Sequence, residues 1–251
     1  MNYVEIPNLP EGPVLLVVVD GRISGKIEQK FRELGVKLIK THAYPGVYEA
    51  ISYHPDIMIH HIGGDAIVYA PGTHPELLNL LSDSGFRLIQ GSCVPGPSYP
   101  ENIPYNAARV GNFAFHNLKY MDPVLKRELD RQGVELVHVN QGYAKCSISV
   151  ISSNCIITAD RGIARTAEAK GVEVLVIEQE EAIVLPGVSS GFIGGSTGLI
   201  DKNRWLITGS LERLKSADKI FSFLSQKGFE IVQASDEQVI DVGSVIPLLT
   251  K

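Results

Sequence analysis

The stretch Gly35-Val36-Lys37-Leu38-Ile39 decides the fold, because the same phrase occurs four more times along the chain. Every copy has a glycine, then Val or Phe, then a charged residue, then two aliphatic residues. The other copies begin at Gly85, Gly133, Gly171 and Gly228. A phrase that recurs at intervals of about 50 residues indicates one supersecondary unit built five times.

The residues before each marker glycine have the apolar spacing of a short helix, and those after it form an apolar run typical of a strand. Glycine just past a helix takes the left-handed conformation at low cost. Asp122, which precedes Pro123, and Asp160 are suited to cap two of these helices. The sequence therefore predicts helices over residues 25–34, 74–84, 122–132, 162–170 and 216–227.

Ahead of four of these helices, two apolar runs flank a short polar turn, which is the signal of a hairpin. The paired runs are 57–62 with 66–69, 107–110 with 113–115, 147–151 with 155–158, and 199–200 with 204–208. The unit is therefore strand, turn, strand, helix, strand. The first unit lacks its leading strand and begins directly at residues 14–19.

A spare apolar stretch over residues 239–249 is suited to replace that missing strand. Its pairing with the first unit would close a ring of five complete units and leave no exposed edge strand. We therefore predict an α/β fold, a five-unit ββαβ propeller in one domain over residues 1–251. The units span approximately 1–45, 46–95, 96–140, 141–180 and 181–238, and the closing strand spans 239–251. The alternative is an open doubly wound sheet, which leaves the turn-linked strand pairs unexplained.

The bulk properties of the chain narrow the classes of partner. It has 251 residues, a net charge of −5 and no cluster of Lys or Arg, so we expect no nucleic-acid partner. Its apolar runs are too short to cross a bilayer, and its first residues lack the pattern of a signal peptide. Three cysteines suit a reducing compartment better than a disulfide framework. We expect a cytoplasmic protein with no membrane partner, and the oligomeric state is left open.

Two segments resemble the strand openings of pentein-fold proteins: residues 141–164, which begin Gln141-Gly142-Tyr143, and residues 194–201, which begin Gly194-Gly195-Ser196. The pentein fold is the β/α propeller of guanidine-modifying enzymes, including arginine and agmatine deiminases, dimethylarginine hydrolases and amidinotransferases. A ribosome anti-association factor shares the fold without catalysis. The resemblance implies a ligand site near the central axis, where the openings of the units converge.

The chain departs from the enzymes of that family at two positions. Their nucleophile is a cysteine just before the final strand, where this chain has Gly243 or Ser244. We also expect no counterpart of the family's His-x-Asp or His-x-Glu catalytic motif. Both departures favour a pentein that binds a ligand without reacting with it.

Cys146 is the candidate nucleophile, because it lies at the opening of the fourth unit, the counterpart of the family's nucleophile position. Lys145 beside it would lower the pKa of the thiol if the two side chains converge, although neighbours on a strand point to opposite faces. The alternative for Cys146 is a buried structural role. Cys155 is predicted to pack in the core, and Cys93 lies in a loop rich in Pro and Gly.

His60, His61 and Asp65 form the densest polar group of the chain, and we predict that they transfer protons. Adjacent histidines on a strand face opposite ways, so at most one of the two points to the axis. The alternative is that residues 63–65 simply form a hairpin turn. As a metal signal the group is weak, and we expect neither a metal nor a cofactor.

Asn106, Ser196, Thr197 and Asp241 lie at the remaining openings and are the predicted substrate-binding residues. Together with Cys146 they would form a polar, partly acidic ring, which suits a planar guanidinium or amidinium cation. The run 194–198 is also suited to hold an anion with its backbone N–H groups. Alternatively, its glycines relieve crowding where the strands converge.

Two functions from different classes follow. The first is a small-molecule enzyme or binder for a guanidino or amidine compound, with amidinohydrolase-like or deiminase-like cleavage of a C–N bond by Cys146. It requires a histidine within reach of the sulfur. The second is a non-catalytic binding protein with a protein or ligand partner, which predicts an exposed apolar patch.

Overall fold

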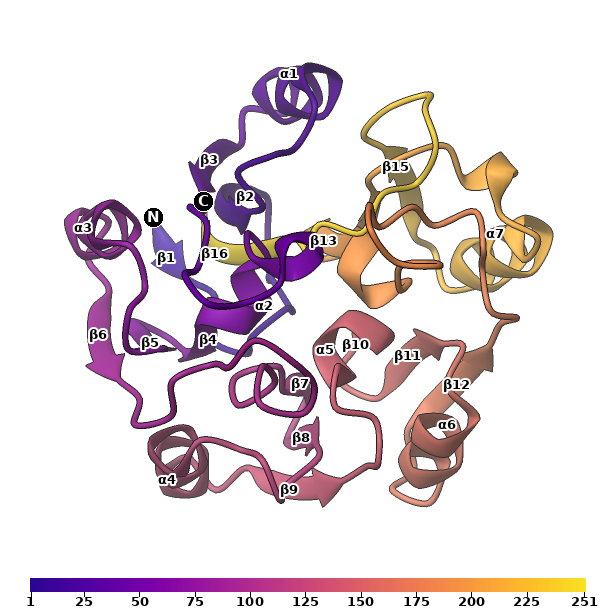
Figure 1. Cartoon of the computed structure of the whole chain (residues 1–251). Coiled ribbons are helices and arrows are strands. Elements are labelled where there is room, and N and C mark those ends of the chain that lie inside the picture. The colour runs from indigo at the N-terminus through magenta and orange to yellow at the C-terminus, as the bar shows by residue number, and fades with distance from the viewer.

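The strands of the computed structural model, which describes residues 1–251, form five small and separate sheets. Four sheets have three strands, and in each of these an antiparallel pair is followed by a parallel pair. The fifth sheet has four strands in the order β1-β16-β2-β3. Figure 1 shows the sheets arranged around a common centre, with the longer helices on the outside.

The strand bounds follow the predicted hairpins closely. The first sheet holds β1 (Asn2–Tyr3), β2 (Val14–Val19), β3 (Lys37–Lys40) and β16 (Ile246–Thr250). The others hold β4 (Ile59–Gly63), β5 (Ala66–Tyr69) and β6 (Arg87–Gln90); β7 (Ala108–Val110), β8 (Phe113–His116) and β9 (Glu135–His138); β10 (Ser149–Ser152), β11 (Cys155–Thr158) and β12 (Glu173–Val176); and β13 (Thr197–Asp201), β14 (Arg204–Ile207) and β15 (Glu230–Gln233). These separate sheets exclude the open doubly wound sheet.

The five predicted helices are confirmed. They are α1 (Gly25–Glu33), α3 (Pro75–Asp83), α4 (Pro123–Arg131), α6 (Arg161–Glu168) and α7 (Ala217–Gln226). Asp122 and Asp160 cap α4 and α6 by accepting backbone N–H bonds, as expected. All five marker glycines have φ between +69° and +93°, the left-handed conformation that ends a helix and starts the next strand.

Short helical turns open several units, and the sequence analysis missed them. They are α2 (Pro55–Met58), α5 (Ala144–Ser147) and the 3-10 turn η2 (Gly194–Ser196). Two further 3-10 turns are η1 (Glu49–Ile51) and η3 (Leu211–Arg213). We had assigned residues 57–58 and 147 to strands, because a turn of three or four residues is too short to show a helical period. Figure 1 shows α2 and α5 near the centre of the molecule.

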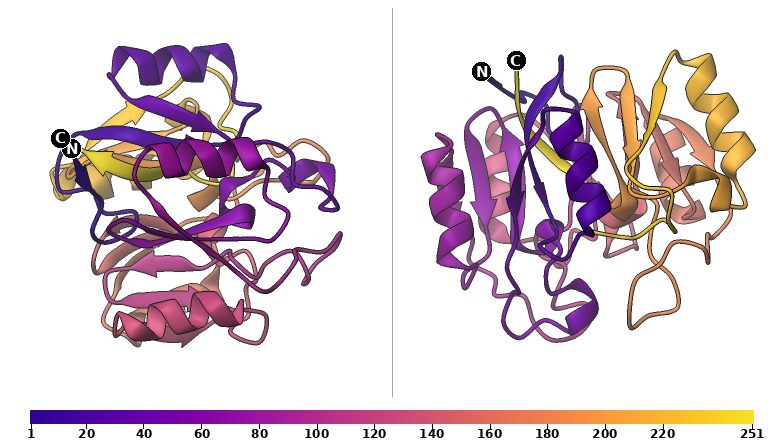
Figure 2. Two further views of the ribbon diagram at one scale, coloured as in Figure 1. Left: turned by 90° about the vertical axis from the view of Figure 1, so that its left-hand side faces the viewer. Right: turned by 90° about the horizontal axis from the view of Figure 1, so that it is seen from above.

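The C-terminal strand completes the first sheet, as predicted, although it is shorter than the expected 239–249. β16 pairs antiparallel with both β1 and β2, and all five of its residues are buried. The two ends of the chain therefore lie side by side, as both views in Figure 2 show. The ladders do not continue from one sheet to the next, so contacts between the units come from side-chain packing and loops. No helix of the protein has the length and apolar character needed to cross a membrane.

Leu248 of β16 tests how far the fold depends on this strand. Its side chain is fully buried in the largest core cluster, whereas Leu15 of neighbouring β2 is only partly buried. Leu248→Ala should lower the free energy of unfolding by about 2–5 kcal/mol, and Leu15→Ala by clearly less. Denaturant unfolding measures both changes. Equal losses in the two variants would contradict a central role for β16.

Candidate active site

The short turns at the strand openings bring together residues that are far apart in the sequence. α2 carries Asp56, α5 carries Cys146, and the segment before β16 carries Asp241 and Ser244. All four side chains are at least 97% buried. These short turns and the segment before β16 thus form one buried polar cluster at the centre of the molecule.

Cys146 contacts two polar side chains. Its thiol donates to Asp56 Oδ2, with 2.9 Å between the sulfur and the oxygen. Asn106 Nδ2 donates to the same sulfur at 3.4 Å, while Asn106 Oδ1 accepts the backbone N–H of Lys145 at 2.9 Å. Asn106, from the third unit, therefore fixes α5 and the orientation of the thiol.

Asp56 lies between Cys146 and Ser244. The Ser244 hydroxyl lies 3.3 Å from Asp56 Oδ2 and 3.0 Å from the Gly194 carbonyl oxygen. Ser244 has φ of +76°, a left-handed conformation that costs a non-glycine residue about 1 kcal/mol or more. This strained residue occupies the position where the resemblance expects the nucleophile.

His54 is the histidine nearest to this cluster. It is fully buried, and neither ring nitrogen has a hydrogen-bond partner. Its Nδ1 lies 3.9 Å from Asp241 Oδ1, and its Nε2 lies 3.9 Å from Asp20 Oδ2. His54-Pro55-Asp56 is a His-x-Asp triplet, so the expectation that the chain has no such motif is wrong. We had assigned the residues that follow to a strand and did not consider the triplet.

Backbone N–H groups hold Asp241 in place. Oδ2 accepts the N–H of Phe192 at 2.8 Å, and Oδ1 accepts that of Gly243 at 3.0 Å. A Cβ on Gly195 would overlap the Asp241 carboxylate, and one on Gly191 would overlap its Cβ. The packing therefore supports the interpretation that the glycines in residues 194–198 relieve crowding.

Cys146, His54 and Asp241 face a cavity of about 190 Å³. The walls are mostly apolar, and aromatic rings make up much of them. The hydroxyls of Tyr48 and Tyr143 lie 3.4 Å apart, and Tyr143 also donates to Asn102. The remaining wall residues are Ile51, Leu185, Val188, Ser190 and Phe192. A cavity of this size suits a small ligand with one polar end.

A second, much smaller cavity lies on the other side of Asp56. It measures about 20 Å³, and its lining includes Asp56, His60, His61 and Lys145. Lys145 and Cys146 are neighbours in α5, yet they line different cavities. The side chains of Lys145 and Cys146 thus point in different directions, as expected for neighbours on a strand, although both residues lie in α5.

Burial dominates the electrostatics of the cluster. It raises the pKa of Asp56 to about 6, although the Cys146 thiol, Lys145 and Ser244 oppose this shift. Burial also raises the pKa of Cys146 well above its ordinary value, and Asp56 and Asp241 add to the rise. The net shift in the pKa of this thiol is therefore upward, even with Lys145 beside it in α5. Burial lowers the pKa of Lys145 itself and that of His54.

The other predicted proton-transfer residues lie apart from the thiol. His60 and His61 are buried in β4, and His61 Nε2 donates to the Gly64 carbonyl oxygen at 2.9 Å. Asp65 is exposed in the turn that follows, and no hydrogen bond joins it to either histidine. The alternative interpretation of residues 63–65 as a hairpin turn matches the β4–β5 connection.

The hydroxyls of Ser196 and Thr197 are occupied by protein groups. Ser196 donates to the Phe192 carbonyl oxygen at 2.8 Å, and Thr197 bonds with Ser149 at 2.8 Å. Neither residue lines the cavity at Cys146, whereas Asp241 does. Cys155 packs in a core cluster, as predicted, and Cys93 is partly exposed in its loop.

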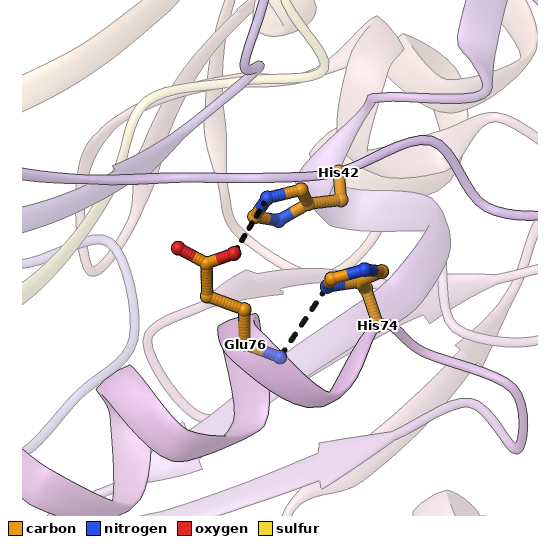
Figure 3. Close-up of side chains that lie close together, drawn as sticks. All are labelled: His42, His74 and Glu76. Atoms are coloured by element: carbon orange, nitrogen blue, oxygen red, sulfur yellow. Dashed lines mark hydrogen bonds and ion pairs between the residues drawn. The ribbon is translucent and has the colours of Figure 1, made fainter.

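A second group of potential ligands lies near the surface. His42, His74 and Glu76 approach one another where the first and second units meet (Figure 3). Their contacts are an ion pair from His42 to Glu76 and a cap on α3, in which His74 Nδ1 accepts the Glu76 N–H. The two imidazoles stack at 4.1 Å with 17° between their planes, so their in-plane lone pairs do not converge on one point.

Another hollow, of about 300 Å³, lies between the fourth and fifth units. Its acidic side chains have structural partners. Asp160 caps α6, and Glu180 accepts the backbone N–H groups of Lys215 and Ser216 at 2.8 Å. Since Phe192 lines both this hollow and the cavity at Cys146, the wall between them is thin.

Several solved structures have a similar architecture. An agmatine deiminase from C. jejuni with substrate bound matches 99% of this chain and 96% of its own, with a TM-score of 0.59 and 10% identity. The inosamine-phosphate amidinotransferase StrB1 from Streptomyces griseus covers 92% and 91%, with a TM-score of 0.57 and 11% identity. A dimethylarginine dimethylaminohydrolase adduct covers 88% and 92%, with a TM-score of 0.53 and 8% identity. These likenesses show that the chain has the pentein fold.

Within that fold, the sequence itself identifies a narrower group. Residues 18–246 match the model of a family described as "Family of unknown function (DUF6873)". The chain therefore belongs to this family. No curated protein matches it.

Buried histidines make the stability depend on pH. Burial lowers the pKa of His61 and that of His116 to about 4, against 6.5 ordinarily. The unfolded chain therefore takes up protons first as the pH falls, and the folded state loses stability between about pH 6.5 and 4. Above pH 6.5 this contribution is fully present. The free energy of unfolding, measured by urea denaturation at several pH values, should fall across that window.

A pair of variants isolates one of these groups. His61→Gln should make the dependence on pH shallower, by up to about 1.4 kcal/mol for each unit of the lost pKa difference. His138→Gln, at an exposed position, should leave the slope as it is in the wild type. An unchanged slope in His61→Gln would show that His61 is not one of the groups responsible.

Proposed function

We propose that this protein binds a small guanidino or amidine compound in the cavity at Cys146 and hydrolyses one of its C–N bonds. The observation that carries the proposal is the composition of this cavity. Its walls are apolar and aromatic, and its polar groups at the cluster are the thiol of Cys146, the imidazole of His54 and the carboxylate of Asp241.

The cavity has the features that a planar cation needs. The rings of Tyr48, Tyr143 and Phe192 offer faces that attract a cation. Asp241 offers a carboxylate that its two backbone N–H donors hold in a fixed orientation. Asn106 does not line the cavity and supports the site from behind by orienting α5. Its predicted role in substrate binding stays a prediction.

In the catalytic form of the proposal, Cys146 Sγ attacks the central carbon of the bound cation. The thiol proton passes to Asp56 Oδ2, which already accepts it at 2.9 Å. Asp56 returns this proton to the departing amine as the C–N bond breaks, which leaves an amidino group on the sulfur. His54, kept neutral by burial, then takes a proton from the water that attacks the amidino carbon. The C–S bond breaks with its electron pair on the sulfur, and the proton on His54 returns to the sulfur and restores the thiol.

A bound cation would also make the thiol easier to ionise. In the resting protein, burial and two carboxylates favour the neutral thiol. A positive charge next to the sulfur favours the thiolate, so the nucleophile forms when the substrate is in place. The roles of His60, His61 and Asp65 stay predictions, because this proposal assigns proton transfer to Asp56 and His54.

The structural relatives support the same class of chemistry. They include an amidinotransferase, an agmatine deiminase and a dimethylarginine dimethylaminohydrolase, whose names describe reactions of guanidino groups. In our proposal the five sheets are the ββαβ units of one propeller domain formed by residues 1–251, and the site lies on its axis. A shared fold does not by itself establish a shared reaction, so the proposal depends on the residues that line the cavity.

The second candidate function is a pentein that binds a ligand without reacting with it. The observation in its favour is the raised pKa of Cys146, because a neutral thiol is a poor nucleophile. Both functions use the same cavity and the same class of ligand. They differ in whether Cys146 becomes reactive when a cation is bound.

Two electrophiles of nearly equal size separate these functions. Chloroacetamidine carries a cationic amidine, and chloroacetamide carries a neutral amide in its place. Cys146 should react with chloroacetamidine faster than with chloroacetamide by about tenfold or more, the equivalent of 1.4 kcal/mol of cation recognition. Intact-mass and peptide mass spectrometry measure the rate at each cysteine, and Cys146→Ser confirms the assignment.

Cys93 is the internal control, because it lies partly exposed in a loop of the same molecule. The ratio of the two labelling rates at Cys93 reports the intrinsic difference in reactivity between chloroacetamidine and chloroacetamide. A ratio at Cys146 no larger than at Cys93 would contradict cation recognition. Slow labelling of Cys146 by both reagents would contradict the enzyme and favour the binding protein.

A further inference from the structure

Three metal-ligand atoms of the central cluster converge. An imidazole nitrogen of His54, a carboxylate oxygen of Asp56 and Sγ of Cys146 all lie within 4.8 Å of one another. All three side chains are at least 98% buried. His54 immediately precedes α2, Asp56 lies within α2, and Cys146 lies within α5. The backbone of these two short helical turns fixes the spacing of the three side chains.

Several polar atoms of this cluster lack a protein partner. Both ring nitrogens of His54 and Oδ1 of Asp56 are buried and accept or donate no hydrogen bond. Buried polar groups are nearly always paired, and an unpaired one costs about 1–3 kcal/mol. A neutral imidazole has a lone pair on one of its two nitrogens, so that nitrogen and Asp56 Oδ1 are unpaired lone-pair donors beside a thiol. A cation with an affinity for nitrogen, oxygen and sulfur would satisfy both.

We propose that His54, Asp56 and Cys146 bind Zn²⁺ or a similar divalent transition metal, with one coordination position open to the cavity of about 190 Å³. The sequence did not predict this metal site. The inference shares its location with the proposed function, and only its regulatory consequence rests on that function. A metal bound to Sγ occupies the electron pair that attack on the substrate requires.

The donor set indicates the class of metal. Thiolate and imidazole ligands suit Zn²⁺ and related transition metals, whereas Mg²⁺ and Ca²⁺ prefer sites made only of oxygen. Three protein ligands with an open fourth position are typical of zinc sites that a small molecule can reach. The cavity provides that access, since His54 and Cys146 both line it.

The surroundings of His54 also resemble those of a metal ligand. Such a histidine usually presents its second ring nitrogen to a carboxylate. Here Nδ1 faces Asp241 and Nε2 faces Asp20, each at 3.9 Å, so either nitrogen can ligate while the other has an acidic neighbour. Arg22 holds the Asp20 carboxylate with a 2.7 Å contact, which keeps this neighbour in place.

Co²⁺ is the probe for this site, because its spectrum reports the ligands directly. Titration of the metal-free wild type should give one equivalent of tightly bound Co²⁺, with a thiolate-to-cobalt charge-transfer band in the near ultraviolet. Cys146→Ser should lose this band, and His54→Gln should weaken binding and alter the visible bands. Cys93→Ser, and His74→Gln at the surface group of Figure 3, should behave as the wild type.

The charge-transfer band keeps the test decisive even if Cys146→Ser or His54→Gln does not fold. Circular dichroism identifies such a variant, and the wild-type and Cys93→Ser spectra then decide between the remaining cysteines. A wild type without a charge-transfer band would overturn the inference. A band that disappears in Cys93→Ser or persists in a folded Cys146→Ser would overturn it as well.

Labelling with chloroacetamidine connects the metal to the proposed function. With free Zn²⁺ at ten times its dissociation constant, labelling of Cys146 should slow about tenfold, because only the metal-free fraction can react. A labelling rate that Zn²⁺ leaves unchanged, in protein shown to hold the metal, would overturn the regulatory consequence.

The two hypotheses fail separately. Rapid labelling of Cys146 in a chelator, without any cobalt band, would overturn the metal site and leave the enzyme proposal intact. A Cys146-dependent cobalt band without labelling would support the metal site and contradict the enzyme proposal.

Discussion

The pairing of β16 with β1 and β2 is the interaction on which the rest of the structure depends. It joins the last strand to the first sheet and places the segment before it at the centre of the molecule. Ser244 and Asp241 thereby reach α2, from which they are separated by most of the chain. Because the closing strand is held by ladders on both sides, this segment tolerates the left-handed backbone of Ser244. The central cluster therefore depends on the pairing of the C-terminal strand as much as on any single sheet.

The electrostatic state of the cluster follows from how deeply it is buried. Three aspartates, a lysine, a histidine and a thiol lie in or around a space from which water is largely excluded. Taking a charge out of water is costly, so burial shifts the pKa of Asp56, Cys146, His54 and Lys145 toward the neutral form of each. Such a cluster responds strongly to an added charge. A bound organic cation or a metal ion would supply that charge.

The sequence predicted the repeated framework well and the site only in part. The marker glycines, the hairpins, the outer helices and the closing strand follow from local patterns that recur, so one unit checks another. Cys146, Asn106 and Asp241 were identified because each occupies the same place in its unit. His54 and Asp56 were missed, because α2 spans only Pro55–Met58 and its residues were assigned to the strand that follows. His60, His61 and Asp65 attracted attention by their density, but the two histidines line the smaller cavity and Asp65 is exposed in the β4–β5 turn.

The position of the thiol shows what the repeat permits. Each unit opens toward the same centre, so an aspartate from the second unit can contact a side chain from the fourth and one from the closing segment at once. Asp56 Oδ2 does this: it lies 2.9 Å from Cys146 Sγ and 3.3 Å from Ser244 Oγ. A reactive group can therefore occupy either opening and keep the same carboxylate as its neighbour. The serine at the closing position thus does not by itself exclude thiol chemistry, because Cys146 has the same carboxylate, Asp56, as its neighbour.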